Sequence, residues 1–341
     1  MAQQTTIIEV EGRELKLSNL DKVLYPAVGF TKAQLIDYYV RIAPVLLPHL
    51  KGRPLTMKRY PEGVAGQFFY EKNCPKHRPD WVKTVPVWSE GNNRWMQYCA
   101  VEDLATLVWA ANLADIELHT SLSLGVKIEQ PTFLVFDLDP GPPANIVQCC
   151  QVGLWVRALF EAMGMDAYPK TSGSKGLQVY VPLHTAATYE DTKSFAREIA
   201  RLLERRHPDR VVSDMKKALR TNKVFVDWSQ NDQYKTTICV YSLRAKDRPT
   251  ASAPLMWEEV EQCLKKQDAD LLVFDSAAVL ERADKHGDLY EPVLKQKQKL
   301  PPISALEKAS AALDGAKVTV PNSSSKPATR KKAVARKKKT A

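Results

Sequence analysis

The sequence predicts an α/β fold, because segments with strand-like and helix-like apolar patterns alternate along most of the chain. Residues 133–136 form an apolar run of strand length, and the Pro140–Gly141 pair that follows is a strand-ending signal. Residues 189–206 instead carry apolar side chains at the spacing of an amphipathic helix. With 341 residues, 44% of them apolar, the chain can bury the core of one large or two ordinary domains.

The elements expected before residue 133 begin with a hairpin over residues 7–17, whose turn is Glu11–Gly12. Thr31 is the expected N-cap of a helix that extends to about residue 47. The other expected elements of this half are a strand at 54–61, an aromatic segment at 67–72, a helix at 101–114 and a strand at 115–120.

The same criteria predict three more strands in the second half of the chain. A helix at 144–163, stopped by Gly164, leads to a turn and a strand that ends at Pro182. The helix at 189–206 is followed by the last two expected strands, at residues 223–228 and 237–243.

Two carboxylates, Asp137 and Asp139, close the apolar strand. Side chains of a strand alternate between faces, so both carboxylates point the same way while Leu138 points into the core. Their backbones lie about 7 Å apart, which allows the side chains to converge on a hard divalent cation. Without a cation, repulsion would raise the pKa of one of them. Two solvated aspartates at a strand end are the alternative for an isolated pair of this kind.

A turn at residues 170–176, K-T-S-G-S-K-G, contains several groups that bind phosphate. Its glycines, serines and lysines offer backbone N–H groups, hydroxyls and ammonium groups to a polyphosphate. It is not a P-loop, because the spacing differs and a strand follows instead of a helix. The aromatic residues at 67–72 lie beside a lysine, a combination that suits stacking on unpaired bases.

The net charge of +10 is concentrated at the C-terminus. Residues 323–341 contain eight Lys or Arg and no acidic residue, which leaves +2 for residues 1–322. This segment has too little apolar surface to fold alone, so we expect a disordered basic arm. Such an arm binds phosphate backbones by counterion release without reading sequence. A tail that serves only solubility is the alternative.

Nothing in the sequence indicates a membrane or secreted protein. No apolar run approaches the roughly 18 residues of a membrane span, and the polar N-terminus has no signal-peptide pattern. The six cysteines show no C-x-x-C spacing, so we expect reduced thiols, with neither a zinc site nor a disulfide framework. They are Cys74, Cys99, Cys149, Cys150, Cys239 and Cys263.

Four motifs, in the order D-L-D-P, T-S-G-S-K-G-L-Q-V-Y, V-F-V-D-W-S-Q-N and Y-S-L-R, resemble the polymerase domain of bacterial ATP-dependent DNA ligase D. That domain belongs to the archaeo-eukaryotic primase superfamily and acts in non-homologous end joining. The resemblance extends over residues 18–257. It implies a primase-polymerase fold with a mostly antiparallel catalytic sheet flanked by helices.

The resemblance also implies the site of a template-dependent nucleotidyltransferase with a two-metal mechanism. Asp137, Asp139 and Asp227 would hold two ions of Mn²⁺ or Mg²⁺ as catalytic ligands. The nucleoside triphosphate would contact Lys58, His119, Ser172, Lys175, Gln178 and Arg244.

The implied macromolecular partner is DNA with gaps or broken ends, which the enzyme would fill and extend with a preference for ribonucleotides. Asn19, Lys22 and Lys32 would bind the 5′-phosphate of the downstream strand. Phe68 and Phe69 would stack on DNA, and the sequence does not select between them. Ku and a separate ATP-dependent DNA ligase are the implied protein partners. The expected location is the cytoplasm, at the nucleoid.

The chain departs from the family pattern in two respects. Gln178 stands where many members have a histidine, and glutamine cannot carry a proton or a positive charge there. The chain also lacks the ligase and phosphoesterase parts of the long forms, so we expect a stand-alone polymerase. The expected organisation is a primase-polymerase domain at residues 1–300, of one or two lobes, followed by a linker and the disordered basic tail at 301–341.

Three other functions are alternatives to this one. A haloacid-dehalogenase-type phosphatase also ends a strand in D-x-D, but Gly141 occupies the position where Thr or Val follows in those enzymes. A DNA-end-binding module without catalysis is disfavoured because Asp137, Asp139 and Asp227 are all present. A primase that needs no primer shares every catalytic residue, and synthesis on a single-stranded template without primer distinguishes it.

Overall fold

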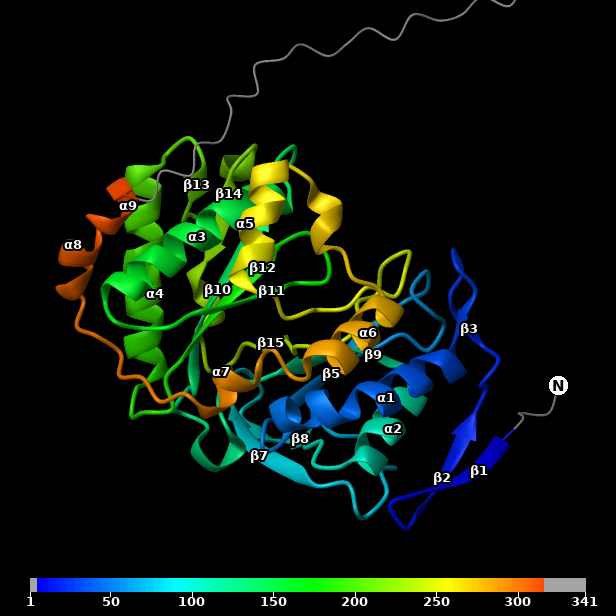
Figure 1. Ribbon diagram of the computed structural model, residues 1–341. Coiled ribbons are helices and arrows are strands. Elements are labelled where there is room, and N and C mark those ends of the chain that lie inside the picture. The colour runs from blue at the N-terminus through cyan, green and yellow to red at the C-terminus, as the bar shows by residue number, and fades with distance from the viewer. Residues whose placement is uncertain (1–4, 316–341) are drawn as a thin grey trace, which may run out of the picture.

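Two β-sheets and the helices packed on them form the body of the protein, as the computed structural model shows for residues 5–315 (Figure 1). Residues 1–4 and 316–341 lie outside the described part. The expected basic arm at 323–341 therefore falls outside the described residues, together with residues 316–322 of the expected linker, whereas residues 301–315 of that linker are described.

The first sheet is built around the strand that carries Asp137 and Asp139. Within residues 5–315 its order is β11-β12-β10-β14-β13, and every neighbouring pair is antiparallel except β13 with β14. The strands are β10 (Phe133–Pro140), β11 (Tyr168–Thr171), β12 (Leu177–Pro182), β13 (Val211–Val212) and β14 (Val224–Asp227). The predicted α/β class with a mostly antiparallel sheet is confirmed.

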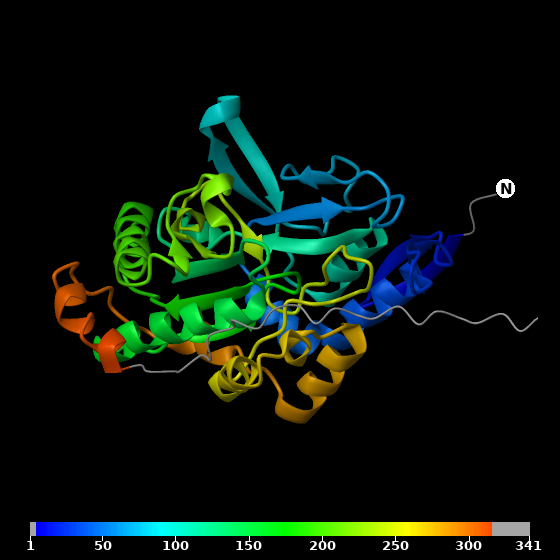
Figure 2. The ribbon, with the colours of Figure 1, turned by 90° about the horizontal axis from the view of Figure 1, so that it is seen from above.

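The second sheet has the order β15-β9-β5-β8-β7 in the described part, and β6 pairs with β5. Its strands are β5 (Leu55–Arg59), β6 (Phe69–Glu71), β7 (Thr84–Ser89), β8 (Arg94–Cys99), β9 (Asp115–Thr120) and β15 (Thr237–Ile238). The β7–β8 hairpin, which the sequence analysis did not predict, stands out from the body of the molecule (Figure 2). Two small hairpins precede this sheet, made of β1 (Thr5–Val10) with β2 (Arg13–Ser18) and of β3 (Val23–Tyr25) with β4 (Phe30–Thr31).

Each sheet has its own helices. Helices α1 (Lys32–Leu50) and α2 (Leu104–Asn112) pack with the second sheet, and α3 (Ile146–Ala162) and α4 (Tyr189–Arg206) pack with the first. The C-terminal part adds α5 (Trp257–Lys266), α6 (Ser276–His286), α7 (Glu291–Lys295), α8 (Ala305–Ala309) and α9 (Ala312–Gly315). Within residues 5–315, no helix combines the length and the apolar character that crossing a membrane requires.

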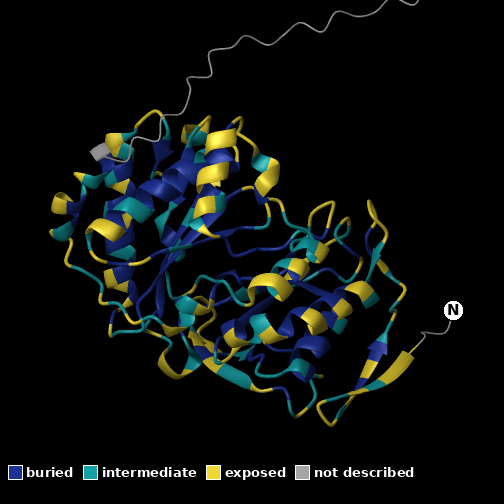
Figure 3. Cartoon of the chain, viewed as in Figure 1, coloured by how far each residue is buried: buried dark blue, intermediate teal, exposed yellow. Residues whose placement is uncertain are grey.

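Strand β10 lies between two hydrophobic cores and contributes to both (Figure 3). Leu134, Phe136 and Leu138 belong to the core around α3, α4 and α5. Phe133 and Val135, on the opposite face, belong to the core around α1, α2 and the second sheet. The alternation of a strand places Asp137 and Asp139 on the face of Phe133 and Val135, so the carboxylates point toward the second sheet.

Several local predictions are confirmed. Glu11 and Gly12 form the turn between β1 and β2 with φ of 50° and 74°. The Thr31 hydroxyl accepts a hydrogen bond from the Gln34 backbone N–H at 3.3 Å, and the Gln34 side chain accepts from the Thr31 N–H at 2.8 Å. This capping box starts α1 where the sequence predicts it, and the helix continues to Leu50.

The predicted strand at 237–243 is wrong beyond its first two residues. β15 ends at Ile238, after pairing with the end of β9. The chain then turns, because the Ser242 N–H bonds to the Cys239 carbonyl at 3.2 Å and Tyr241 has a φ of 66°. Val240 and Ser242 are therefore buried as parts of a turn, and not as parts of a strand.

The expectation that all cysteines are reduced is also wrong in this structure. Cys74 and Cys99 form a disulfide, whereas Cys149, Cys150, Cys239 and Cys263 are free and buried. Cys99 ends β8, and the Cys74 N–H bonds to the Gln97 carbonyl at 2.6 Å, which holds the loop after β6 against β8. The two cysteines are 25 residues apart, so local spacing could not indicate that they meet.

Candidate functional site

A cavity of about 480 Å³ opens between the two sheets, where the carboxylates of β10 face the second sheet. Both sheets contribute to its wall, as do the segments on either side of β15. The residues that line it are Thr56, Tyr70, Lys72, His119, Asp137, Gln178, Gln230, Tyr234, Lys235, Thr236, Thr237, Ile238 and Arg244. Of these, His119, Asp137, Gln178 and Arg244 were predicted from the sequence.

The carboxylates form an acidic group on the first sheet. Asp137 is directly opposite Asp227 on β14, and Asp139 lies two residues along the same face of β10. Burial and the charge of Asp139 raise the pKa of Asp137 to about 7. Burial and the charge of Asp227 also raise the pKa of Asp139. Crowded carboxylates with raised pKa values are the electrostatic condition that a divalent cation relieves.

The carboxylate of Asp227 is hydrogen-bonded to the residues that directly follow β14. Its Oδ1 accepts hydrogen bonds from the Ser229 N–H at 3.0 Å and the Ser229 hydroxyl at 2.5 Å, and its Oδ2 accepts from Gln230 Nε2 at 3.2 Å. Lys235 donates in turn to the Ser229 hydroxyl. In the described residues, no group of three His, Cys, Asp or Glu side chains is arranged as a ready-made metal site. Asp137 and Asp139 fit a divalent cation by charge and position, and Asp227 fits once its side chain leaves Ser229.

A buried lysine lies behind the acidic group. Lys170 is 0% exposed, and burial lowers its pKa to about 7. Its Nζ donates to Gln178 Oε1 at 2.5 Å, to Ser252 Oγ at 2.7 Å and to the Ile238 carbonyl at 3.1 Å. Gln178 faces Asp137 across the sheet and hydrogen-bonds to it. The glutamine that replaces the family's histidine thus uses its oxygen toward Lys170 and has its amide N–H groups left for Asp137.

Basic side chains lie on and beside the second sheet, and burial lowers the pKa of one of them, His119. Lys58 on β5 and His119 on β9 both contact Glu117, at 3.4 Å and 3.0 Å from its Oε2. Arg244 Nε lies 3.3 Å from the other oxygen of Glu117. Glu117 is 2% exposed and was missed by the sequence analysis, although it alternates with His119 on the same strand.

Aromatic side chains surround Lys58. Its Nζ lies 4.5 Å from the ring centroid of Phe68, 5.4 Å from that of Tyr60 and 5.5 Å from that of Tyr70. The neighbouring Phe69 packs on Arg59. Phe68 and Phe69 remain 50% and 44% exposed, so both predicted stacking residues offer ring surface to a partner. Tyr70 is 55% exposed and is a third such ring, which the sequence analysis did not single out.

The S-G-S-K turn connects β11 to β12 beside Arg244. The Ser172 hydroxyl oxygen accepts from the Gly176 N–H at 3.1 Å, and Arg244 Nη1 donates to the Ser172 carbonyl at 2.8 Å. Gly173 has a φ of 67°, and a Cβ there would lie 2.6 Å from the Ala251 backbone. Only glycine fits such a position without strain.

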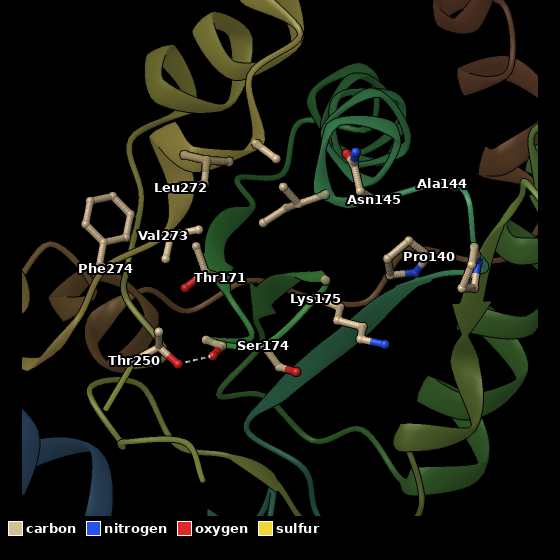
Figure 4. Close-up of a pocket in the computed structure, with 15 residues that line it drawn as sticks. Pro140, Ala144, Asn145, Thr171, Ser174, Lys175, Thr250, Leu272, Val273 and Phe274 are labelled. Atoms are coloured by element: carbon tan, nitrogen blue, oxygen red, sulfur yellow. Dashed lines mark hydrogen bonds between the residues drawn. The ribbon is translucent and has the colours of Figure 1, made fainter. Parts of the chain in front are cut away.

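Lys175 lines a different cavity from Asp137. This second cavity, of about 350 Å³, lies on the other side of the turn, between the start of α3 and the segment around Phe274 (Figure 4). Lys175 and Ser174 lie on one wall, and Asn145, Leu272 and Phe274 lie on the others. The structure therefore separates Lys175 from the predicted nucleotide contacts His119, Gln178 and Arg244.

The three residues predicted to bind a 5′-phosphate lie together at the start of α1. The Lys22 N–H bonds to the Asn19 carbonyl, and the Lys32 N–H bonds to the Lys22 carbonyl. Lys22 Nζ is 2.8 Å from Glu62 Oε2, and Lys32 Nζ donates to the Ser18 carbonyl at 2.6 Å. Burial, with the positive charge of Lys22, lowers the pKa of Lys32 to about 8.

Comparison with known proteins shows the family of the chain. A family model described as LigD, primase-polymerase domain, matches residues 31–290. The multifunctional non-homologous end joining protein LigD of Mycolicibacterium smegmatis is 41% identical over 281 residues, which are 82% of this chain and 36% of that protein. The bifunctional non-homologous end joining protein LigD of Bacillus subtilis is 32% identical over 275 residues, which are 80% of this chain and 43% of that protein.

A solved structure is similar over nearly its whole length. The polymerase domain from Mycobacterium tuberculosis Ligase D in complex with DNA is 38% identical, with a TM-score of 0.76 over 83% of this chain and 99% of that one. The chain spans 36% to 43% of the length of the two LigD relatives named above. The resemblance noted in the motifs is confirmed: the chain belongs to the LigD primase-polymerase domain family.

Proposed function

We propose that this protein is a template-dependent nucleotidyltransferase that fills gaps and extends broken DNA ends in non-homologous end joining. The observation that carries the proposal is the cavity between the sheets, where Asp137, crowded by the charges of Asp139 and Asp227, lines one wall and His119 and Arg244 line the other. A nucleoside triphosphate with its metal ions matches this division, because its phosphates need cations and its metal ions need carboxylates.

Asp137 and Asp139, joined by Asp227, are the proposed ligands of two Mn²⁺ or Mg²⁺ ions. Such ions lower the pKa of an attacking hydroxyl and stabilise a leaving pyrophosphate. The reaction forms a bond between the primer 3′-oxygen and the α-phosphorus and breaks the bond from that phosphorus to the pyrophosphate oxygen. Gln178 orients Asp137, and the side chains of His119, Arg244 and Lys58 contribute donors for the triphosphate. Positioning and electrostatics of this kind supply most of the rate in phosphoryl and nucleotidyl transfer.

The DNA contacts follow from the same arrangement. Phe68 and Phe69 are proposed to stack on DNA, because their rings are exposed. We propose that Asn19, Lys22 and Lys32 bind a downstream 5′-phosphate. Lys22 would then give up its ion pair with Glu62 and contact the phosphate instead. Ser172 and Lys175 stay proposed nucleotide contacts; Lys175 has to swing across its turn to reach the first cavity. Ku and a separate ATP-dependent ligase are the proposed partners, at the nucleoid in the cytoplasm.

Extension of a gapped duplex with a downstream 5′-phosphate tests this function. Ribo- and deoxynucleotides are supplied in parallel, each with Mn²⁺ or Mg²⁺, and a single-stranded template without primer is the third substrate. We expect addition to the gapped duplex with both sugars, faster with ribonucleotides, and none with Asp137→Ala. Failure to add either sugar with either metal contradicts the proposal. Synthesis on the primer-free template at a similar rate identifies a primase instead.

A further inference from the structure

Glu117 is a buried carboxylate to which none of the steps above assigns a role. It lies on β9, directly opposite Lys58 of β5, and its side chain is 2% exposed. Each of its oxygens has two partners. Oε2 contacts Lys58 and His119, and Oε1 contacts Arg244 Nε and accepts from the Ala245 N–H at 3.0 Å.

These partners come from three separate segments of the chain and share one property. Lys58, His119 and Arg244 are basic residues that the proposed function assigns to the nucleotide, and His119 and Arg244 line the cavity. Without a negative charge between them, Lys58 and Arg244 would repel one another in a partly buried site. Glu117 is the only acidic side chain in the described residues that contacts all of them.

The ionised state of Glu117 is maintained by its surroundings. Burial opposes ionisation, but the hydrogen bond from His119 and the charge of Arg244 hold the pKa of Glu117 below its usual range. Glu117 accepts hydrogen bonds from Lys58, His119 and the Ala245 N–H, and its charge attracts Arg244, so it restrains the direction of all three basic side chains.

Arg244 extends the arrangement to the phosphate-binding turn. While its Nε faces Glu117, its Nη1 donates to the Ser172 carbonyl. Lys58 extends it in the other direction, to Phe68 and Tyr70. Glu117 is thus linked through Arg244 to the turn that contains Ser172, and through Lys58 to the aromatic rings of Phe68 and Tyr70.

We propose that Glu117 is a positioning residue for nucleotide binding, which holds Lys58, His119 and Arg244 in the directions that a triphosphate requires. The proposal rests on the proposed function and adds to it a residue that does not itself touch the substrate. It competes with a simpler effect, because loss of a negative charge next to the cations could by itself strengthen the binding of an anion.

Two variants separate these effects. Glu117→Gln keeps the size of the side chain but removes its charge and places an amide N–H group against the donors. Glu117→Asp keeps the charge, but its side chain is shorter by one methylene group. We expect the KM for the nucleotide to rise about tenfold or more in Glu117→Gln, the equivalent of one charge-assisted hydrogen bond, while kcat changes less than about threefold. Glu117→Asp should lie between this variant and the wild type.

Glu259→Gln is the matched control. Glu259 pairs with Arg282 at 2.6 Å and 2.8 Å between α5 and α6, so the same substitution breaks a comparable Arg contact away from the cavity. Its KM should stay at the wild-type value even where its stability falls. This separates a lost orientation at the cavity from a general loss of stability.

Nucleotide affinity is also measured without turnover, by calorimetric titration of a non-hydrolysable nucleoside triphosphate in the presence of Mn²⁺. Wild-type protein that neither binds the analogue nor extends DNA contradicts the proposed function itself. Wild-type binding with equal or tighter binding by Glu117→Gln overturns only the role of Glu117. Wild-type affinity in Glu117→Asp would also overturn the role of Glu117. It would show that a negative charge is sufficient even when the carboxylate is displaced. Weaker analogue binding by both variants, with DNA affinity unchanged, supports the proposal.

Discussion

Lys170 Nζ lies 2.5 Å from Gln178 Oε1, and both side chains are buried beneath the carboxylate wall of the cavity. The contact decides which end of the glutamine amide faces Asp137. Because the oxygen is occupied by the lysine, the N–H end is left for the carboxylate. A histidine at the same position would present one ring nitrogen to each neighbour, so the two residue types can make equivalent contacts here.

Lys170→Met should therefore impair nucleotide addition without emptying the cavity of its carboxylates. The Gln178 oxygen and the Ser252 hydroxyl lose their donor, which costs about 1–3 kcal/mol for a buried polar group. We expect kcat/KM for the nucleotide to fall at least tenfold. Combination with Gln178→Leu should be less than additive, because both substitutions disturb one contact. Strict additivity in extension assays and urea unfolding would show that the two residues act separately.

Asp137→Ala or Asp139→Ala should abolish nucleotide addition while DNA affinity stays close to wild type. Each substitution removes a proposed metal ligand and leaves the cations at the start of α1 and at the cavity mouth in place. Primer extension measures the first effect, and fluorescence anisotropy with labelled gapped DNA measures the second. Addition at a rate near wild type by either variant would remove that aspartate from the metal site.

Lys22→Ala and Lys32→Ala should weaken the binding of gapped DNA only when the downstream end carries a phosphate. A charge-assisted contact is worth about 1.5–3 kcal/mol and is lost with its partner. The affinity ratio between phosphorylated and hydroxyl ends is the readout, with the remote exposed Lys295→Ala as control. Equal weakening on both ends would make these lysines general backbone contacts.

Glu62→Gln should have the opposite effect from the lysine variants. The Lys22–Glu62 pair is exposed, and such pairs are worth at most about 1 kcal/mol. Removing the competing carboxylate should therefore tighten binding of the phosphorylated end by no more than about fivefold. An unchanged preference for phosphate would indicate that Glu62 already points elsewhere when DNA binds.

Asp288 gives a prediction for the pH dependence of stability. It accepts from Tyr241 at 2.7 Å and lies 2.8 Å from His49. Burial opposes its ionisation, but the hydrogen bond with His49 holds the pKa of Asp288 below its ordinary value of 3.8. The ionised group thus stabilises the fold above pH 3.8, and this stabilisation is lost as the pH falls through the lower, folded-state pKa.

Asp288→Asn should therefore lower the free energy of unfolding by about 1.5 kcal/mol at pH 6, because the hydrogen bonds with Tyr241 and His49 lose their ionised acceptor. The same difference should be found at pH 5, and it should shrink only below the ordinary pKa. Urea unfolding of both proteins at pH 6, 5 and 3 measures this. A difference that already disappears between pH 6 and 5 would show that another group controls it.

The sequence predicted those parts of the site that depend on local pattern. Alternation along β10 was enough to place Asp137 and Asp139 on one face, and Thr31 was recognised from its capping residues. The family motifs indicated His119, Gln178 and Arg244, which the structure brings to one cavity.

What the sequence could not predict depends on contacts between distant segments. Glu117 acquires its importance from partners 59 and 128 residues away, and Lys170 from partners up to 82 residues away. In the sequence, Glu117 is one acid in a short alternating strand and Lys170 is one of two lysines near a turn. The Cys74–Cys99 bond and the side of the turn occupied by Lys175 were missed for the same reason.

The position of β10 between two cores has a consequence for how the protein acquires activity as it folds. A slip of one residue in its pairing with β12 and β14 would exchange the two faces, so Leu138 would enter the cavity and the aspartates would enter the core. The five apolar residues of the strand resist this, because each set fits only the core it now occupies. Misregistered chains should thus be poorly packed and should also lack the proposed metal ligands at the cavity, so we expect partially folded molecules to be inactive. The burial that stabilises each half of the protein therefore also fixes the face on which Asp137 and Asp139 lie.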